Sequence, residues 1–320
     1  MSQQNVLNVV DLTVYYYTKR GVIHAVEDVS LTADKMDFVA IVGESGSGKS
    51  TLVYALLNLV PPPGRIVKGS IFVDGIDILR LSGDKLRRAR GSLISMVFQD
   101  PFTTLDPIRR VGDQIAEVLI EHGISKDEAY ARVGEVLESV GLSRNIANAY
   151  PHQLSGGQRQ RVSIAAAIAL NPRVLVADEP TTALDVIVQK QIMDLIDRIR
   201  LSTGMSIILI THDIALAVER ATKIVVMYAG KIVEYGSKQS IIEEPLHPYT
   251  QALLASVPDI ESGKWPKSIP GTPPDLRNPP TGCRFHPRCP YSSDLCRIKQ
   301  PDLVGYGKNH YVSCWLYIRK

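Results

Sequence analysis

Residues 43–50 read GESGSGKS, that is, a glycine, four residues and then Gly-Lys-Ser. They follow a short apolar run at 38–42 and lead into a helical pattern at 51–59. Glycines let backbone amides approach an anion closely, and a helix N-terminus adds a favourable dipole. The segment therefore predicts a strand, loop and helix that bind nucleotide phosphates, with Lys49 on the terminal phosphates and Ser50 on Mg²⁺. The predicted contact residues are Gly43, Glu44, Ser45, Gly46, Ser47, Gly48, Lys49, Ser50 and Thr51.

A second apolar run, residues 174–177, leads directly into two carboxylates, Asp178 and Glu179. Nearly continuous apolar runs of this length are typical of parallel strands buried on both faces. Open parallel sheets place their ligands at the carboxyl ends of the strands. Asp178 is therefore predicted to bind Mg²⁺, and Glu179 to orient and deprotonate the attacking water.

Two more apolar runs end in single polar groups. Residues 95–98 lead to Gln99, and residues 206–210 lead to Thr211 and His212. Each group alone would be an ordinary loop residue, but together with the phosphate loop and the two carboxylates they predict one site.

Residues 154–158 read LSGGQ and begin a helical pattern that Asn171 and Pro172 end. The predicted anion-binding residues are Ser155, Gly156, Gly157 and Gln158. Backbone amides at a helix N-terminus favour a phosphate. Because the chain already has a phosphate loop, this second anion site predicts a contact with a second nucleotide.

The rest of the chain shows three kinds of pattern. Alternating apolar and polar residues up to about position 35 predict antiparallel strands, and residues 228–236 predict a hairpin that turns at Ala229 and Gly230. Residues 101–154 are mostly helical and predict an inserted subdomain. Nine of the 20 prolines lie between 258 and 290, which predicts a linker to an annex with little helix.

Composition narrows the class of protein. With 45% hydrophobic and 22% charged residues the chain is ordinary for a globular protein. The net charge of +3 is too mild to indicate nucleic acid, and the basic cluster at 85–90 is expected to be a solvated helix face. No apolar run approaches the roughly 18 residues of a membrane span, and residues 1–8 lack a signal pattern. A cytosolic chain is expected, with any membrane role supplied by partner subunits.

In their order along the chain, these motifs resemble the ATP-binding cassette (ABC) family. They are the phosphate loop, Gln99, LSGGQ, Asp178 with Glu179, the turn TALD at 182–185, and His212. The resemblance covers about residues 6–242 and implies an α/β fold. This fold is a RecA-like P-loop NTPase core with an antiparallel β subdomain and an inserted helical subdomain, in a cassette domain of residues 1–242.

The resemblance also implies an ABC-type ATPase that hydrolyses ATP with Mg²⁺. Two cassettes of this family sandwich two ATP molecules head to tail, so the LSGGQ helix of one chain meets ATP held by the other. The residue roles carried over are Tyr16 stacking on adenine, Gln99 on the metal and beside the helical subdomain, Asp185 at the nucleotide, and His212 at the terminal phosphate.

The C-terminal part, 243–320, resembles the dipeptide and oligopeptide importer branch of that family. The resemblance rests on residues 244–258, EPLHPYTQALLASVP, and on the annex at about 281–316. It implies a peripheral motor subunit on the cytoplasmic face of the membrane that couples ATP hydrolysis to uptake of di- or oligopeptides. The implied partners are a second, different ABC ATP-binding subunit as a heterodimer, two transmembrane permease subunits and an extracellular substrate-binding protein.

Three alternatives compete with this interpretation. The same motor could serve an oligosaccharide or another small solute. A soluble ABC ATPase of DNA repair would interrupt the cassette with a long coiled coil, and one of translation would carry two cassettes. A redox enzyme that happens to bind ATP would rest on the annex alone.

All four cysteines lie in the annex, at Cys283, Cys289, Cys296 and Cys314. Their spacing matches neither a zinc ribbon nor the common ferredoxin patterns, so spacing leaves an iron–sulfur cluster, Zn²⁺ and disulfides open. A reducing cytosol disfavours disulfides. The branch resemblance implies a [4Fe–4S] cluster on these cysteines, with Zn²⁺ as the alternative, and a structural role for the metal.

Overall fold

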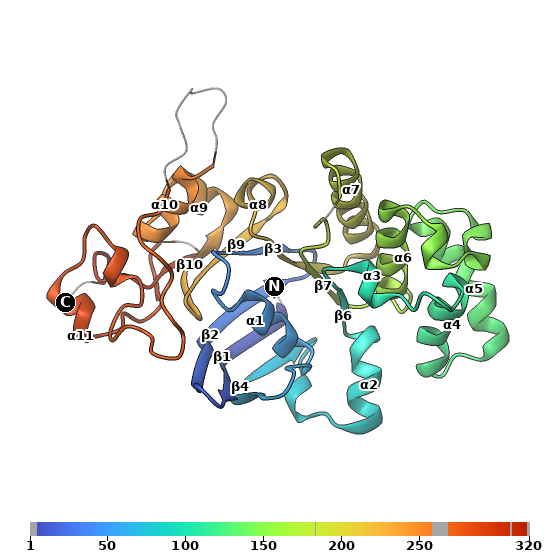
Figure 1. The fold of residues 1–320 in the computed structure, drawn as a ribbon, viewed down its shortest axis with the longest axis horizontal. Helices are drawn as coiled ribbons and strands as arrows, with labels where there is room; N and C mark the ends of the chain where they lie inside the picture. Colours follow the sequence, from blue (N-terminus) through green and yellow to red (C-terminus); the bar gives the residue numbers. More distant parts are fainter. Residues whose placement is uncertain (1–4, 183, 258–267, 308, 319–320) are drawn as a thin grey trace. The chain divides into compact units, whose positions relative to one another are not determined.

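The computed structural model describes residues 5–182, 184–257, 268–307 and 309–318. The chain divides into two compact units. Of the described residues, the first unit contains 5–7, 33–36 and 72–208, and the second contains 8–32, 37–71 and the rest from 209 onward. The predicted α/β fold is confirmed, because helices alternate with the strands of a large sheet (Figure 1).

The first unit contains strands that precede the polar residues predicted for the site. Strand β6 (Ile94–Val97) pairs in parallel with β7 (Val174–Asp178), and β8 (Ser206–Ile210) lies on the other side of β7. All five residues of β7 and of β8 are buried, as expected of strands covered on both faces. Gln99 follows β6, Asp178 and Glu179 lie at the end of β7, and Thr211 and His212 follow β8. The predicted polar groups thus lie at the carboxyl ends of these strands.

Helices fill the interval between β6 and β7. In Figure 1 the helices α4, α5 and α6 gather in the green part of the chain. In α4 the buried residues Val111, Ile115 and Leu119 recur every four positions, so one apolar face packs inward. The helices of this unit are η1 (Ile78–Arg80), α2 (Gly83–Ser92), α3 (Pro101–Thr104), α4 (Val111–Glu121), α5 (Lys126–Ser139), η2 (Arg144–Asn148), η3 (Pro151–Gln153), α6 (Gly156–Ile168) and α7 (Val186–Thr203).

In the second unit, strand order is β11-β12-β10-β9-β3, with the end of β8 next to β3. Strand β3 (Phe38–Val42) runs parallel to β9 (Lys223–Tyr228), and β10 (Lys231–Ser237) is antiparallel to β9. Ala229 and Gly230 both have positive φ, at 49° and 83°, which suits a tight hairpin turn. The predicted hairpin is confirmed. Strands β11 (Val304–Gly305) and β12 (His310–Val312) come from the annex, a contribution that the sequence did not predict.

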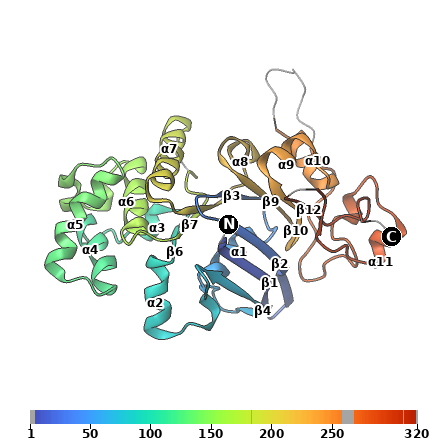
Figure 2. The same ribbon diagram turned by 180° about the vertical axis from the view of Figure 1, so that it is seen from behind.

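The second unit also holds most of a smaller sheet of order β2-β1-β4-β5, in which β1 and β2, the two strands predicted before position 35, are neighbours. Figures 1 and 2 show α8, α9 and α10 along one side of β3, β9 and β10, and α1 along the other. The remaining elements are β1 (Asn5–Thr18), β2 (Gly21–Asp34), α1 (Lys49–Leu56), β4 (Gly64–Val73), β5 (Ile76–Asp77), α8 (Ile214–Arg220), α9 (Lys238–Glu243), α10 (Pro248–Ala255), η4 (His286–Arg288) and α11 (Asp294–Ile298).

The C-terminal segment, which here means the described residues from 243 onward, is anchored by a buried carboxylate, Glu234, on β10. Glu234 is fully buried and accepts hydrogen bonds from the backbone amides of Leu246 and His247 at 2.8 and 2.9 Å. His310 Nε2 lies 2.8 Å from its Oε1. Burial lowers the pKa of His247 to about 4, so this ring is neutral at pH 7, and its Nδ1 accepts a hydrogen bond from the Tyr249 amide. The Glu234 side chain therefore joins β10, the start of α10 and β12.

We expect Glu234→Ala to lower the free energy of unfolding by about 3 kcal/mol, because buried donors would lose their acceptor. Urea denaturation of the full chain measures the change. Glu243→Ala is the matched control, since this exposed carboxylate on α9 accepts hydrogen bonds from the side chain of Gln239. Equal denaturation midpoints for the two variants would show that Glu234 does not anchor the segment.

Candidate active site

The phosphate loop has the predicted position between β3 and α1. Gly43, Gly46 and Gly48 have φ values of 154°, 76° and 99°, a range that L side chains rarely adopt. A Cβ at Gly43 would lie 2.2 Å from the Met227 carbonyl oxygen, and one at Gly48 would lie 2.2 Å from that of Ala25. These two positions therefore require glycine for space as well as for conformation.

Lys49 is the buried cation of this loop. Its side chain folds over the loop, and Nζ donates to the carbonyl oxygens of Gly43 and Glu44 at 2.8 and 2.9 Å and to Ser47 Oγ at 3.4 Å. Ser50, one residue later, is exposed. The loop thus combines a fixed ammonium group with an accessible hydroxyl, the pair that a nucleotide with Mg²⁺ needs.

The structure distinguishes the three consecutive tyrosines of β1. The Tyr16 hydroxyl lies 3.4 Å from Thr51 Oγ1, at the end of the phosphate loop. The Tyr15 hydroxyl instead donates a hydrogen bond to Glu27, and the Arg65 guanidinium lies over the exposed Tyr17 ring, 5.8 Å from its centroid. Tyr16 is therefore the tyrosine of the three whose hydroxyl meets a loop residue.

Gln99 and Glu179, which are 80 positions apart, come together in the first unit. Gln99 Nε2 donates to Glu179 Oε2 at 3.1 Å, and Thr182 Oγ1 donates to the same oxygen at 3.2 Å. Glu179 has a positive φ of 44° directly after the strand, and the preceding Asp178 is buried. The sequence pattern did not identify Thr182 as a partner of Glu179, although it lies in the TALD turn, whose residue 183 is outside the described residues.

The LSGGQ segment caps helix α6. Ser155 is the N-cap residue, and its Oγ accepts from the Gln158 amide at 3.3 Å. Gln158 Oε1 accepts in return from the Ser155 amide at 3.0 Å. This capping box starts the helix at Gly156, within the LSGGQ segment as the sequence predicts, and the Ser155 residue at the helix end is exposed.

Asp185 and His212 occupy other element ends. Asp185 is the N-cap of α7, where its Oδ1 accepts from the Val188 amide at 3.0 Å. His212 is exposed and follows Thr211, whose amide donates to the Ile41 carbonyl at 3.3 Å. The predicted residues thus fall into two sets. The first unit carries Gln99, Ser155 to Gln158, Asp178, Glu179 and Asp185, and the second carries Tyr16, residues 43–51 and His212.

Sequence reasoning missed two residues of the C-terminal segment at the phosphate loop. The Glu44 amide donates to the Tyr249 hydroxyl at 2.9 Å, and Arg288 forms an ion pair with the Glu44 carboxylate. These partners are 205 and 244 positions from Glu44. No local pattern signals a contact at that separation.

The iron–sulfur prediction is contradicted. Cys283, Cys289, Cys296 and Cys314 do line one cavity of about 90 Å³. However, among the residues that the structure describes, no group of three or more His, Cys, Asp or Glu side chains is placed to hold a metal ion. Burial raises the pKa of Cys283 to about 11 and that of Cys314 to about 12, so both side chains are neutral thiols in this structure. The zinc alternative has no support for the same reasons.

Comparison with known proteins agrees with the cassette geometry. Residues 26–182 match the ABC transporter family, and residues 233–296 match the oligopeptide/dipeptide transporter C-terminal region. The oligopeptide transport ATP-binding protein OppD of Bacillus subtilis is 46% identical, over 97% of this chain and 88% of its own length. The dipeptide transport ATP-binding protein DppD of the same organism is 44% identical, over 98% and 95%.

Solved structures show the same similarity over the cassette. A dimeric bacterial ABC transporter cassette is 31% identical with a TM-score of 0.64, over 72% of this chain and 98% of the other. A post-hydrolysis state of such a cassette, bound to ADP and Pi, has a TM-score of 0.63 at the same identity and coverage. The chain therefore belongs to the ABC transporter family, in the branch with the oligopeptide/dipeptide transporter C-terminal region, and is an ABC-type ATPase.

Proposed function

We propose that this chain is the ATP-hydrolysing motor subunit of an importer for di- or oligopeptides. The observation that supports this most is the similarity to oligopeptide and dipeptide transport ATP-binding proteins along nearly the whole chain, including residues 233–296. The C-terminal region favours peptides over oligosaccharides or other solutes, and it favours a transporter over a soluble ABC ATPase. In this proposal the cassette is residues 1–242, with helices inserted at about 101–154, and the extension is residues 243–320.

The second unit would bind the nucleotide. Tyr16 would stack on adenine, a role that its contact with Thr51 at the end of the loop supports. The amides of the loop would surround the phosphates, and Lys49 would exchange its carbonyl acceptors for the terminal phosphates. His212 would contact the terminal phosphate from the end of β8.

Three oxygen-bearing side chains would hold Mg²⁺. They are the exposed Ser50 hydroxyl, the Gln99 amide and the Asp178 carboxylate, and oxygen ligands suit this hard cation. Bound Mg²⁺ would neutralise charge on the phosphates during transfer.

Glu179 would act as the general base on water. Two donors, Gln99 and Thr182, meet at its Oε2 and hold the carboxylate in one orientation. A carboxylate fixed in this way can align the attacking water and accept its proton. Gln99 would therefore both bind Mg²⁺ and orient the base.

The LSGGQ helix would act on ATP held by a second, different cassette subunit. Its capping box orders the first turn of α6, so the amides at Gly156 and Gly157 would be preorganised for a phosphate. Asp185, the N-cap of α7, would make a further nucleotide contact. In the described part of the chain, no helix has the length and hydrophobicity of a bilayer-spanning segment. Two permease subunits and an extracellular binding protein would complete the importer, with this chain on the cytoplasmic face.

We expect Glu179→Gln to keep ATP binding and to lower turnover in the assembled importer by roughly 10²–10⁴-fold, because it removes the base and keeps the size. Phosphate release measures turnover, and Glu135→Gln on the exposed face of α5 is the matched control. Lys49→Ala should instead weaken ATP binding. Turnover by Glu179→Gln at the parent rate would show that another group is the base.

A second prediction concerns assembly. The chain alone should hydrolyse ATP slowly, since its LSGGQ group is expected to serve ATP on another chain, and turnover should rise when the second cassette and the permeases are added. Steady-state phosphate release at matched chain concentration tests this. A purified single chain as fast as the complex would contradict the two-cassette arrangement.

A further inference from the structure

Arg288 of the C-terminal segment holds the side chain of Glu44 in the phosphate loop. Its Nη1 donates to Glu44 Oε2 at 2.6 Å, and its Nη2 donates to Oε1 at 3.0 Å. The Arg288 side chain is 4% exposed, and that of Glu44 is 25% exposed. Two parallel hydrogen bonds to one carboxylate fix its orientation as well as its position. The second residue of the loop is thereby tied to the C-terminal segment.

The other donors of Arg288 are also used within the protein. Nε donates to the Pro270 carbonyl at 2.8 Å, Nη1 to the Tyr228 hydroxyl at 3.3 Å, and Nη2 to the Ile269 carbonyl at 3.4 Å. A guanidinium group has five N–H donors, so these bonds and the two to Glu44 engage all of them. Any effect of Arg288 on a nucleotide would therefore pass through Glu44 and not through direct contact.

The backbone of Glu44 is held as well. Its amide donates to the Tyr249 hydroxyl, and its carbonyl accepts from Lys49. Burial raises the pKa of Tyr249, so this hydroxyl is neutral and available as an acceptor. The Tyr249 ring packs against Phe285 and Tyr228, with centroids 5.4 and 4.7 Å apart. Two of the three polar groups of Glu44 thus depend on the C-terminal segment.

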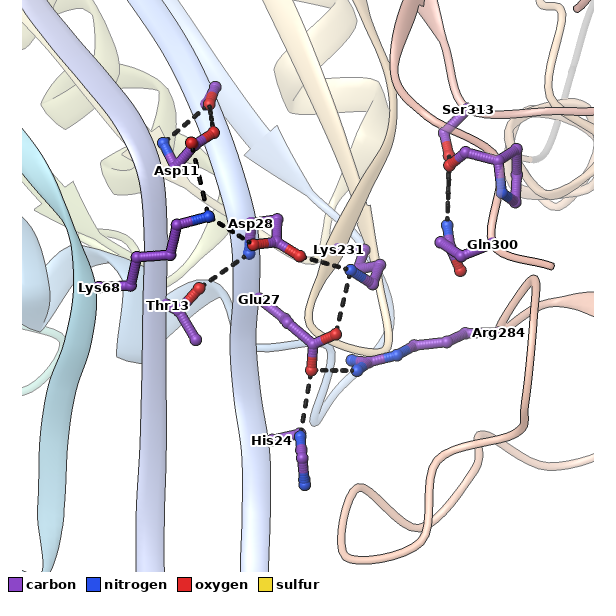
Figure 3. A network of polar contacts seen from close by, with 12 residues as sticks. Asp11, Thr13, His24, Glu27, Asp28, Lys68, Lys231, Arg284, Gln300 and Ser313 are labelled. Atoms are coloured by element: carbon purple, nitrogen blue, oxygen red, sulfur yellow. Dashed lines mark hydrogen bonds and ion pairs between the residues drawn. The ribbon is translucent and has the colours of Figure 1, made fainter.

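A second set of contacts reaches the other end of the loop at Ser47. Figure 3 shows Arg284 pointing at Glu27, to which it donates at 2.7 Å, and Arg284 also donates to the Ala229 carbonyl. The next amide, that of Gly230, donates to the Ser47 carbonyl at 2.9 Å. Although burial raises the pKa of Glu27, neighbouring cations, Arg284 first, lower it to about 2. The hairpin turn that supports Ser47 is therefore clamped by a charged pair.

We propose that Arg288 and Tyr249 are positioning residues of the nucleotide site, which keep the phosphate loop in its binding shape through Glu44. The proposal rests on the proposed function, because the loop must bind ATP. Without Arg288, the Glu44 carboxylate would lose its counter-charge beside the phosphates, and the loop would lose one support. Both changes weaken ATP binding.

A double-mutant cycle on the full chain tests this. Equilibrium binding of a fluorescent ATP analogue gives Kd for the parent, Arg288→Ala, Glu44→Gln and the double variant. We expect Arg288→Ala to raise Kd about tenfold with Glu44 present and less than about threefold with Gln at position 44. The same increase in both backgrounds would overturn the proposal, because Arg288 would then not act through Glu44.

Two control variants show whether a negative result means that the positioning role is wrong, that the phosphate-site assignment is wrong, or that Arg288 only stabilises the fold. Arg277→Ala removes an exposed ion pair with Asp275 in the same segment and should leave Kd unchanged. Lys49→Ala should weaken ATP binding, and if this variant binds ATP like the parent, the assignment of the phosphate site is wrong. If Lys49→Ala weakens binding while Arg288→Ala lowers only the unfolding midpoint and keeps the parent Kd, the positioning role is overturned.

Tyr249→Phe covers the case in which Arg288→Ala does not fold. It removes the acceptor of the Glu44 amide and keeps the aromatic packing, so we expect Kd to rise about threefold. A folded Tyr249→Phe chain with the parent Kd would overturn the role of Tyr249.

Discussion

The phosphate loop packs so closely against its surroundings that two of its residues can be nothing but glycine. The carbonyl oxygen of Met227 occupies the place of a side chain at Gly43, and that of Ala25 does so at Gly48. Loop geometry therefore depends on where the end of β9 and the strand β2, which contains Ala25, lie. The parallel pairing of β9 with β3 brings the Met227 carbonyl to the loop, so the sheet order of this unit is part of the binding site.

The C-terminal segment belongs to the same physical unit as the loop. Glu234 joins it to the sheet through buried hydrogen bonds, and β12 extends that sheet next to β10. From this base, Arg288 and Tyr249 reach Glu44. A charged pair that is largely desolvated requires its partners in fixed positions, and the anchoring of the segment supplies them. The described C-terminal residues are therefore packed into the same compact unit as the phosphate loop and are not merely tethered to it.

The cysteine annex shows where a prediction from clustering in sequence and from resemblance fails. Four cysteines close together in sequence suggest a metal site, and the fold does bring them to one cavity. Ligation also needs side chains that converge on one point, and in the described residues no group of three or more potential ligands is placed to hold a metal ion. Clustering in sequence predicted the shared location correctly, whereas side-chain direction and burial, which decide the chemistry, come from packing.

The sequence by itself determined the strands β3 and β8, the strand-to-helix phosphate loop and the start of a helix at LSGGQ, because apolar runs and glycine-rich helix starts act over a few neighbouring positions. Only the tertiary structure decided which of three tyrosines meets Thr51, that Thr182 joins Gln99 on Glu179, and that Arg288 holds Glu44. Most of these contacts join residues tens to hundreds of positions apart, or depend on the face of a strand that packing selects. Local periodicity does not encode such pairings, because they depend on how the strands and helices pack when the apolar side chains of the whole chain are buried.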